Sequence, residues 1–147
     1  MIKKLLLIIL LSISAFGDFE NTTFLRENAK EVVINSFTGL MWQDDSRAKN
    51  VEKDWSDAKV YCQNLVHAGY DDWYLPSISE LETLVDTKKQ NPAIKKGFEN
   101  VSSSFYWSSS SDVSDSHSAW YVYFKPGYID SYDKSDEYNV RCVRVGQ

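Results

Sequence analysis

Six residues in one short stretch of the sequence have the types and spacing that ligand recognition needs. They are Tyr121, Tyr123, Tyr128, Asp130, Tyr132 and Asp133. They lie on two expected strands joined by a tight Lys-Pro-Gly turn. Tyrosine rings stack on the apolar faces of ligands, and carboxylates accept hydrogen bonds from hydroxyl groups. The combination suits a sugar or a peptide ligand. The alternative is cross-strand pairing that only stabilises the sheet.

Residues suited to catalysis are scarce. The two histidines are His67 and His117, and the second has Asp115 and Ser116 beside it. Adjacent residues do not converge on one reacting atom as a catalytic triad does. Acids that could bind calcium are Asp112, Asp115, Asp130, Asp133, Asp136 and Glu137. None belongs to an EF-hand loop, so solvated loop charges are the favoured explanation. We therefore predict no enzyme, no metal site and no cofactor.

The chain contains two cysteines, Cys62 and Cys142. An even number of cysteines in an exported protein suggests a disulfide. Two free buried thiols, or one catalytic thiol, are the alternatives. Neither cysteine lies in a C-x-x-C pattern or beside a histidine, which disfavours both alternatives.

The first 17 residues have the anatomy of a secretory signal peptide. Lys3 and Lys4 precede an apolar run from Leu5 to Phe16, and small residues precede the expected cut before Asp18. Two of the 16 basic residues and none of the 21 acids lie in this segment, which leaves 14 − 21 = −7 for the rest. An acidic protein has no general attraction for nucleic acid. We expect an exported protein of the periplasm, cell surface or extracellular space, with no stable membrane insertion after cleavage.

The remaining chain predicts helices and strands in an α+β order. Residues 18–30 are expected to be a loose lead-in, and residues 31–147 form one domain. The expected elements are a hairpin of residues 32–34 and 40–42, a polar loop over 44–53, a helix over 55–67, a second helix from 78 to about 86, and strands at 105–107, 119–124, 128–133 and 139–145. A capping box at Ser77 and Glu80 begins the second helix. Alternation along strand 119–124 places Trp120, Val122 and Phe124 on one face and Tyr121 and Tyr123 on the other.

Eight stretches in the same order resemble the Lcl C-terminal domain family, the globular end of collagen-like adhesins. They are Thr38–Gln43; Trp55, Ala58 and Tyr61-Cys62; Gly69-Tyr70 with Trp73; Leu75-Pro76 with Glu80-Leu81; Asn91–Ile94; Tyr106–Ser109; Ala119–Val122; and Val140–Arg144. The resemblance implies a C-type-lectin-like fold, with two helices packed on antiparallel sheets and a disulfide between Cys62 and Cys142. One departure is Tyr74, where the family has arginine.

The favoured function is a secreted, non-enzymatic module that binds a glycan or a protein at the bacterial envelope, as in adhesion. One alternative is a diverged enzyme related to the formylglycine-generating fold, with a reactive cysteine. Another is a structural envelope component that binds no small ligand. Such a component could be an oligomer.

Overall fold

The computed structural model describes residues 24–146. The expected signal peptide, residues 1–17, lies outside the described residues, as do 18–23. Within the described range, no helix is long and apolar enough to span a bilayer.

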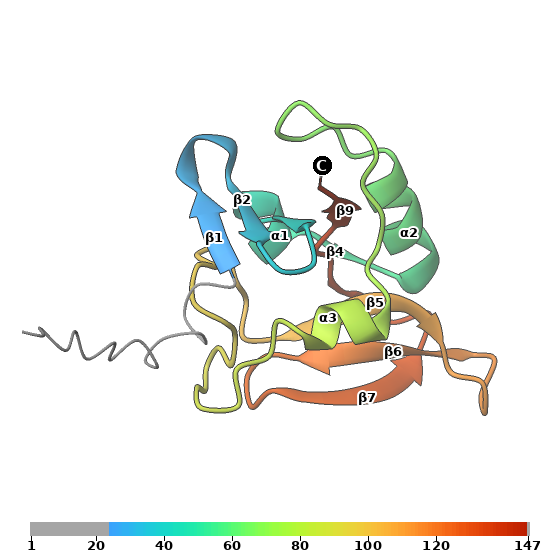
Figure 1. Cartoon of the computed structure of the whole chain (residues 1–147). Coiled ribbons are helices and arrows are strands. Elements are labelled where there is room, and N and C mark those ends of the chain that lie inside the picture. The colour runs from blue at the N-terminus through green and yellow to red at the C-terminus, as the bar shows by residue number, and fades with distance from the viewer. Residues whose placement is uncertain (1–23, 147) are drawn as a thin grey trace, which may run out of the picture.

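Two sheets and three α-helices make up the described part, which confirms the α+β class (Figure 1). The four-stranded sheet has the order β1 (Phe24–Glu27), β2 (Val32–Asn35), β3 (Leu40–Gln43) and β9 (Val143–Val145). The five-stranded sheet has the order β4 (Glu52–Lys53), β8 (Tyr138–Asn139), β5 (Phe105–Ser111), β6 (Ser118–Tyr123) and β7 (Tyr128–Asp133). Neighbouring strands are antiparallel except β5 and β8. The C-type-lectin-like relationship stays a prediction.

The hairpin of β2 and β3 is confirmed, but the lead-in is more ordered than expected. The Asn35 side chain accepts hydrogen bonds from the Phe37 and Thr38 amides, and Gly39 takes a positive φ of 74°. This Asx-type turn fixes the register of the hairpin. Residues 24–27 then pair with β2 as strand β1, and Asn28–Lys30 form a 3-10 turn.

The polar stretch 44–53 was expected to be a loop, and that expectation is wrong. Asp45 caps a short helix, α1 (Ser46–Asn50), by accepting hydrogen bonds from the Arg47 and Ala48 amides, and β4 follows. A capping residue can begin a helix that has no apolar stripe. The hydrophobic periodicity of the sequence therefore did not predict α1.

Both expected helices exist but are shorter than predicted. Helix α2 (Trp55–Gln63) ends before His67, because residues 67–70 form their own bridged turn with Ala68 and Gly69 at positive φ. Helix α3 (Ile78–Glu82) begins with the predicted capping box. It ends early because Val85 pairs instead with Ile94 in a bridge.

The expected closing strand, residues 139–145, is divided between the two sheets. Residues before Val140 join the five-stranded sheet as β8, and those from Val143 join the four-stranded sheet as β9. Cys142 lies in the crossing segment rather than within a strand. Its disulfide to Cys62 of α2, with a Cα–Cα distance of 5.5 Å, confirms the predicted pairing.

The core has two clusters of buried residues. One surrounds the disulfide and includes Trp73 and Trp107. The other lies between the four-stranded sheet, α3 and one face of β5 and β6, where α3 lies over the strands (Figure 1). It includes Trp42, Tyr106 and Phe124. On the other face of β6, Ala119 and Tyr121 belong to the first cluster, so the outer part of that face remains for the predicted site.

Candidate ligand-binding site

The register of β6 and β7 collects five of the six predicted site residues on one face. Tyr123 pairs with Tyr128, Tyr121 with Asp130, and Ala119 with Tyr132. Directly paired residues of antiparallel strands point to the same side of a sheet. We call this surface, made of Tyr121, Tyr123, Tyr128, Asp130 and Tyr132, the tyrosine face.

Asp133, the sixth predicted residue, does not belong to this face. It pairs with Ser118 and therefore points to the opposite side. Its carboxylate accepts hydrogen bonds from the Ser135 amide and hydroxyl, each at 2.8 Å, which lower its pKa. Asp133 therefore orders the turn after β7. The prediction counted carboxylates near the tyrosines without applying the two-residue period of the strand.

Neighbouring strands extend the face with rings that the sequence prediction did not include. Phe105 stacks on Tyr123 at 4.2 Å between ring centroids, and Trp107 lies 4.4 Å from Tyr138. Phe105 and Trp107 alternate around Tyr106, so their shared face could have been predicted. Tyr138 comes from a two-residue strand that carries no such signal.

Exposure increases across the face toward its outer edge. Tyr121 is 6% exposed, whereas Tyr128 is 46% and Tyr132 is 55% exposed. Trp120, on the opposite side of β6, is half-buried. The buried rings thus form a rigid base, and Tyr128 and Tyr132 are available to a ligand.

Asp130 lies between the two exposed tyrosines. Its carboxylate accepts a hydrogen bond from the Ser131 amide at 2.8 Å, which leaves further lone pairs for a ligand. Two aromatic rings flanking a carboxylate can stack on the C–H faces of a sugar and bind its hydroxyls.

Two buried tyrosine hydroxyls of this region, those of Tyr121 and Tyr138, keep their protons to high pH. Burial and the Asp130 charge together raise the pKa of Tyr121 to about 12. Burial and Asp136 raise the pKa of Tyr138 to about 12 in the same way. At neutral pH these hydroxyls are therefore uncharged hydrogen-bond donors and acceptors.

Tyr74, where the family has arginine, is used within the fold. Its hydroxyl donates a 2.9 Å hydrogen bond to Glu80 Oε1, while Glu80 Oε2 accepts from the Ser77 amide in the capping box. Burial, together with Glu80, raises the pKa of Tyr74 to about 12. Tyr74 thus supports the helix cap through Glu80.

Raising the pH from about 10 to about 12 is expected to lower the free energy of unfolding progressively. Tyrosines of an unfolded chain ionise near pH 10, whereas Tyr74, Tyr121 and Tyr138 ionise near 12 in the fold. Their stabilisation is therefore complete below pH 10 and lost as the pH rises through 12. Urea unfolding across this range measures the fall, and Tyr121→Phe should make it smaller. An equal fall in the variant would contradict the assignment.

The acids of the loop after β5 are bound by nearby hydroxyls and amides. Ser114 and Ser131 hydroxyls donate to Asp112 at 2.6 Å each and hold its pKa at about 2. The Ser118 hydroxyl donates to Asp115, whose pKa is lowered. Among the described residues, no group of three or more histidine, cysteine, aspartate or glutamate side chains is placed to hold a metal ion.

The family comparison matches residues 31–144 to the model of the Lcl C-terminal domain. No curated protein matches the chain. The matched range contains α2, the disulfide and the tyrosine face.

Proposed function

This chain belongs to the Lcl C-terminal domain family, and on that basis we propose that it is an exported, non-enzymatic recognition domain that binds a glycan through its tyrosine face. The family is that of an adhesin-like domain, which fits a recognition role. The observation that carries the proposal is the exposed Tyr128–Asp130–Tyr132 set on a packed aromatic base. A protein ligand is the alternative that the experiments below distinguish.

A preorganised surface supports this role. The buried members of the face, such as Trp107 and Tyr121, hold the outer rings on a hydrogen-bonded sheet. Little conformational entropy is then lost when a ligand binds. The excess of acids over bases disfavours a sulfated polysaccharide and favours an uncharged glycan.

Export is proposed from the cysteines together with the expected signal peptide. Both cysteines of the chain are in the disulfide, and disulfides persist mainly in oxidising compartments. The periplasm, the cell surface and the extracellular space all satisfy this condition.

The non-enzymatic part of the proposal follows from the same disulfide. A diverged enzyme of the formylglycine-generating type would need a reactive thiol, and Cys62 and Cys142 are both oxidised. The two histidines also lie in unrelated settings, since the His67 side chain is 9% exposed and the His117 side chain 88%. Thiol titration of the native protein tests this, and a reactive thiol would favour the enzyme.

Replacing Tyr128 and Tyr132 together with alanine is expected to weaken glycan binding by at least about tenfold, because exposed aromatic anchors carry much of the binding energy of such surfaces. A glycan array identifies the ligand, and calorimetry with the soluble oligosaccharide measures the dissociation constant. Asp130→Asn should also weaken binding, since it removes a charged acceptor. The fold should be unaffected, because these side chains are exposed.

Ile129→Ala is the matched control, since Ile129 lies on the same strand, is 40% exposed and points to the opposite face. Its affinity should equal that of the wild type. If Ile129→Ala lost as much affinity as the double tyrosine variant, the effect would come from a change in the strand as a whole. If no glycan on the array binds, and a protein from envelope extract binds in a way that depends on Tyr128 and Tyr132, the ligand is a protein instead of a glycan. A stable oligomer that buries β7 would favour the structural role.

A further inference from the structure

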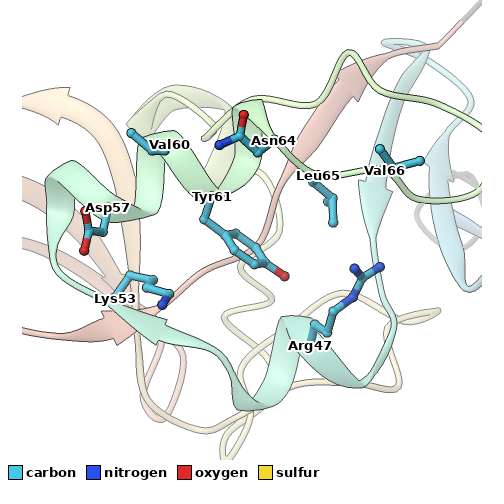
Figure 2. Close-up of a pocket in the computed structure, with 8 residues that line it drawn as sticks. All are labelled: Arg47, Lys53, Asp57, Val60, Tyr61, Asn64, Leu65 and Val66. Carbon is cyan, nitrogen blue, oxygen red and sulfur yellow. The ribbon is translucent and has the colours of Figure 1, made fainter.

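A pocket separate from the tyrosine face lies between α1, β4 and α2 (Figure 2). Its volume is about 360 Å³, within the range of roughly 300–1,000 Å³ typical of small-molecule sites. Its lining residues are Arg47, Lys53, Asp57, Val60, Tyr61, Asn64, Leu65 and Val66. We infer that this pocket binds a small organic carboxylate that carries an apolar group.

Arg47 supplies the anion-binding end of the pocket. Its Nε donates to Asp45 Oδ2 at 2.6 Å, and its Nη2 lies 3.2 Å from His67 Nδ1. These contacts hold the guanidinium in place while Nη1 stays available to a ligand oxygen. A guanidinium fixed in this way binds a carboxylate with strong, charge-assisted hydrogen bonds.

The neighbouring acids do not occupy this end of the pocket. Asp45 is buried, and its Oδ1 accepts from Gln43 Nε2 at 2.9 Å and from the α1 backbone. Asp57 lines the pocket at the other end, beside Lys53, in Figure 2. The cation facing a ligand at the α1 end is therefore Arg47.

His67 is placed so that one of its tautomers supports this arrangement. Arg47 can only donate to Nδ1 if that atom carries no proton. The Nε2 atom then carries the proton and donates to the Glu31 carbonyl at 3.1 Å. In this tautomer the imidazole positions the guanidinium by accepting from Nη2.

The Tyr61 hydroxyl lies beside the Arg47 guanidinium in Figure 2 and has no hydrogen-bond partner among the described residues. Burial raises the pKa of Tyr61, so it remains a donor. The nearby Gln43 side chain lowers this pKa as a donor, but the hydroxyl proton itself has no acceptor in the described part of the chain. The Arg47 side chain is 42% exposed, so a ligand can reach its guanidinium from the solvent. A carboxylate oxygen entering there would give the buried hydroxyl its missing partner.

Aliphatic side chains form the rest of the wall. Val60 is 50% and Val66 is 70% exposed at the rim, and Leu65 and the Tyr61 ring lie deeper. Exposed valines at the rim of a pocket gain stabilisation when an apolar ligand covers them. The cationic end and the aliphatic wall together define a ligand that is charged at one end and apolar at the other.

Titration with hexanoate, followed by two-dimensional NMR, tests this inference on the folded domain. Hexanoate should shift the pocket resonances and saturate with a dissociation constant on the order of 1 mM. Hexanol, which lacks the charge, should bind at least about tenfold more weakly. Arg47→Gln should weaken hexanoate binding at least about tenfold, whereas Lys49→Gln, which removes the same charge from an exposed site on α1, should leave it unchanged.

Equal binding of hexanol, wild-type affinity in Arg47→Gln, or resonance shifts confined to the tyrosine face would each overturn the inference. If Arg47→Gln fails to fold, as judged by thermal unfolding, the half-exposed Val60 provides a second variant. Val60→Asn should weaken hexanoate binding by about threefold or more, because it removes part of the aliphatic wall. Because the two sites are separate, these results are independent of glycan binding at Tyr128 and Tyr132.

Discussion

Replacing Asp44 with asparagine is expected to lower the free energy of unfolding by about 3–5 kcal/mol, because it leaves a buried cation without its counter-ion. Asp44 and Arg141 are both 0% exposed, and Arg141 Nη1 donates to Asp44 Oδ1 at 2.8 Å. Arg26 also donates to Asp44. Asparagine keeps the shape of the side chain and removes the charge. Unfolding in guanidinium chloride measures the loss.

The same carboxylate joins segments that are distant in sequence. It accepts hydrogen bonds from the Glu99 and Asn100 amides, while Arg141 Nη2 donates to the Asn100 carbonyl at 2.6 Å. The end of β3, the loop before β5 and the segment between β8 and β9 therefore meet at one ion pair. Its loss should loosen all three.

Glu82→Gln is the control, because this exposed acid ends α3 and should change stability by less than about 0.5 kcal/mol. A double variant, Asp44→Leu with Arg141→Met, should lose less than the sum of the single variants, since it removes the buried Arg141 together with its counter-ion, and Arg26 keeps its ion pair with Glu99. A loss below about 1 kcal/mol in Asp44→Asn would show that water or rearrangement compensates the arginine.

The sequence predicted those parts of the fold that depend on local chemistry. The capping box at Ser77, the turn between β2 and β3, and the strand 128–133 each follow from residues within a few positions of one another. Alternation along strand 119–124 predicted the shared face of Tyr121 and Tyr123, but it was not applied to strand 128–133, where it would have excluded Asp133. The Cys62–Cys142 pairing followed from the resemblance to the family.

Features that depend on distant partners could not be predicted in this way. Asp44 read as part of a polar loop, because its partner Arg141 is 97 positions away. The division of the last strand depends on Arg141, whose guanidinium is held by the Gln43 and Asn100 carbonyls where the chain crosses between sheets. The Arg47 pocket needs α1, β4 and α2 together, and no local pattern marks it.

Removing the disulfide by the double replacement Cys62→Ala and Cys142→Ala is expected to lower the free energy of unfolding by about 3–5 kcal/mol. The bridge spans 80 positions, and the entropy that it removes from the unfolded chain grows with the length of the closed loop. Both cysteines are 0% exposed in the core. Urea unfolding of both proteins, with and without reductant, measures the effect.

Reductant separates the covalent contribution from the packing contribution. It should lower the stability of the wild type toward that of the variant and leave the variant unchanged, because only the wild type has a bond to reduce. The tyrosine face lies on the sheet against which α2 packs, so glycan binding should fall in parallel with the folded fraction. A wild type that keeps its stability after complete reduction would mean that core packing alone holds α2 against the crossing segment.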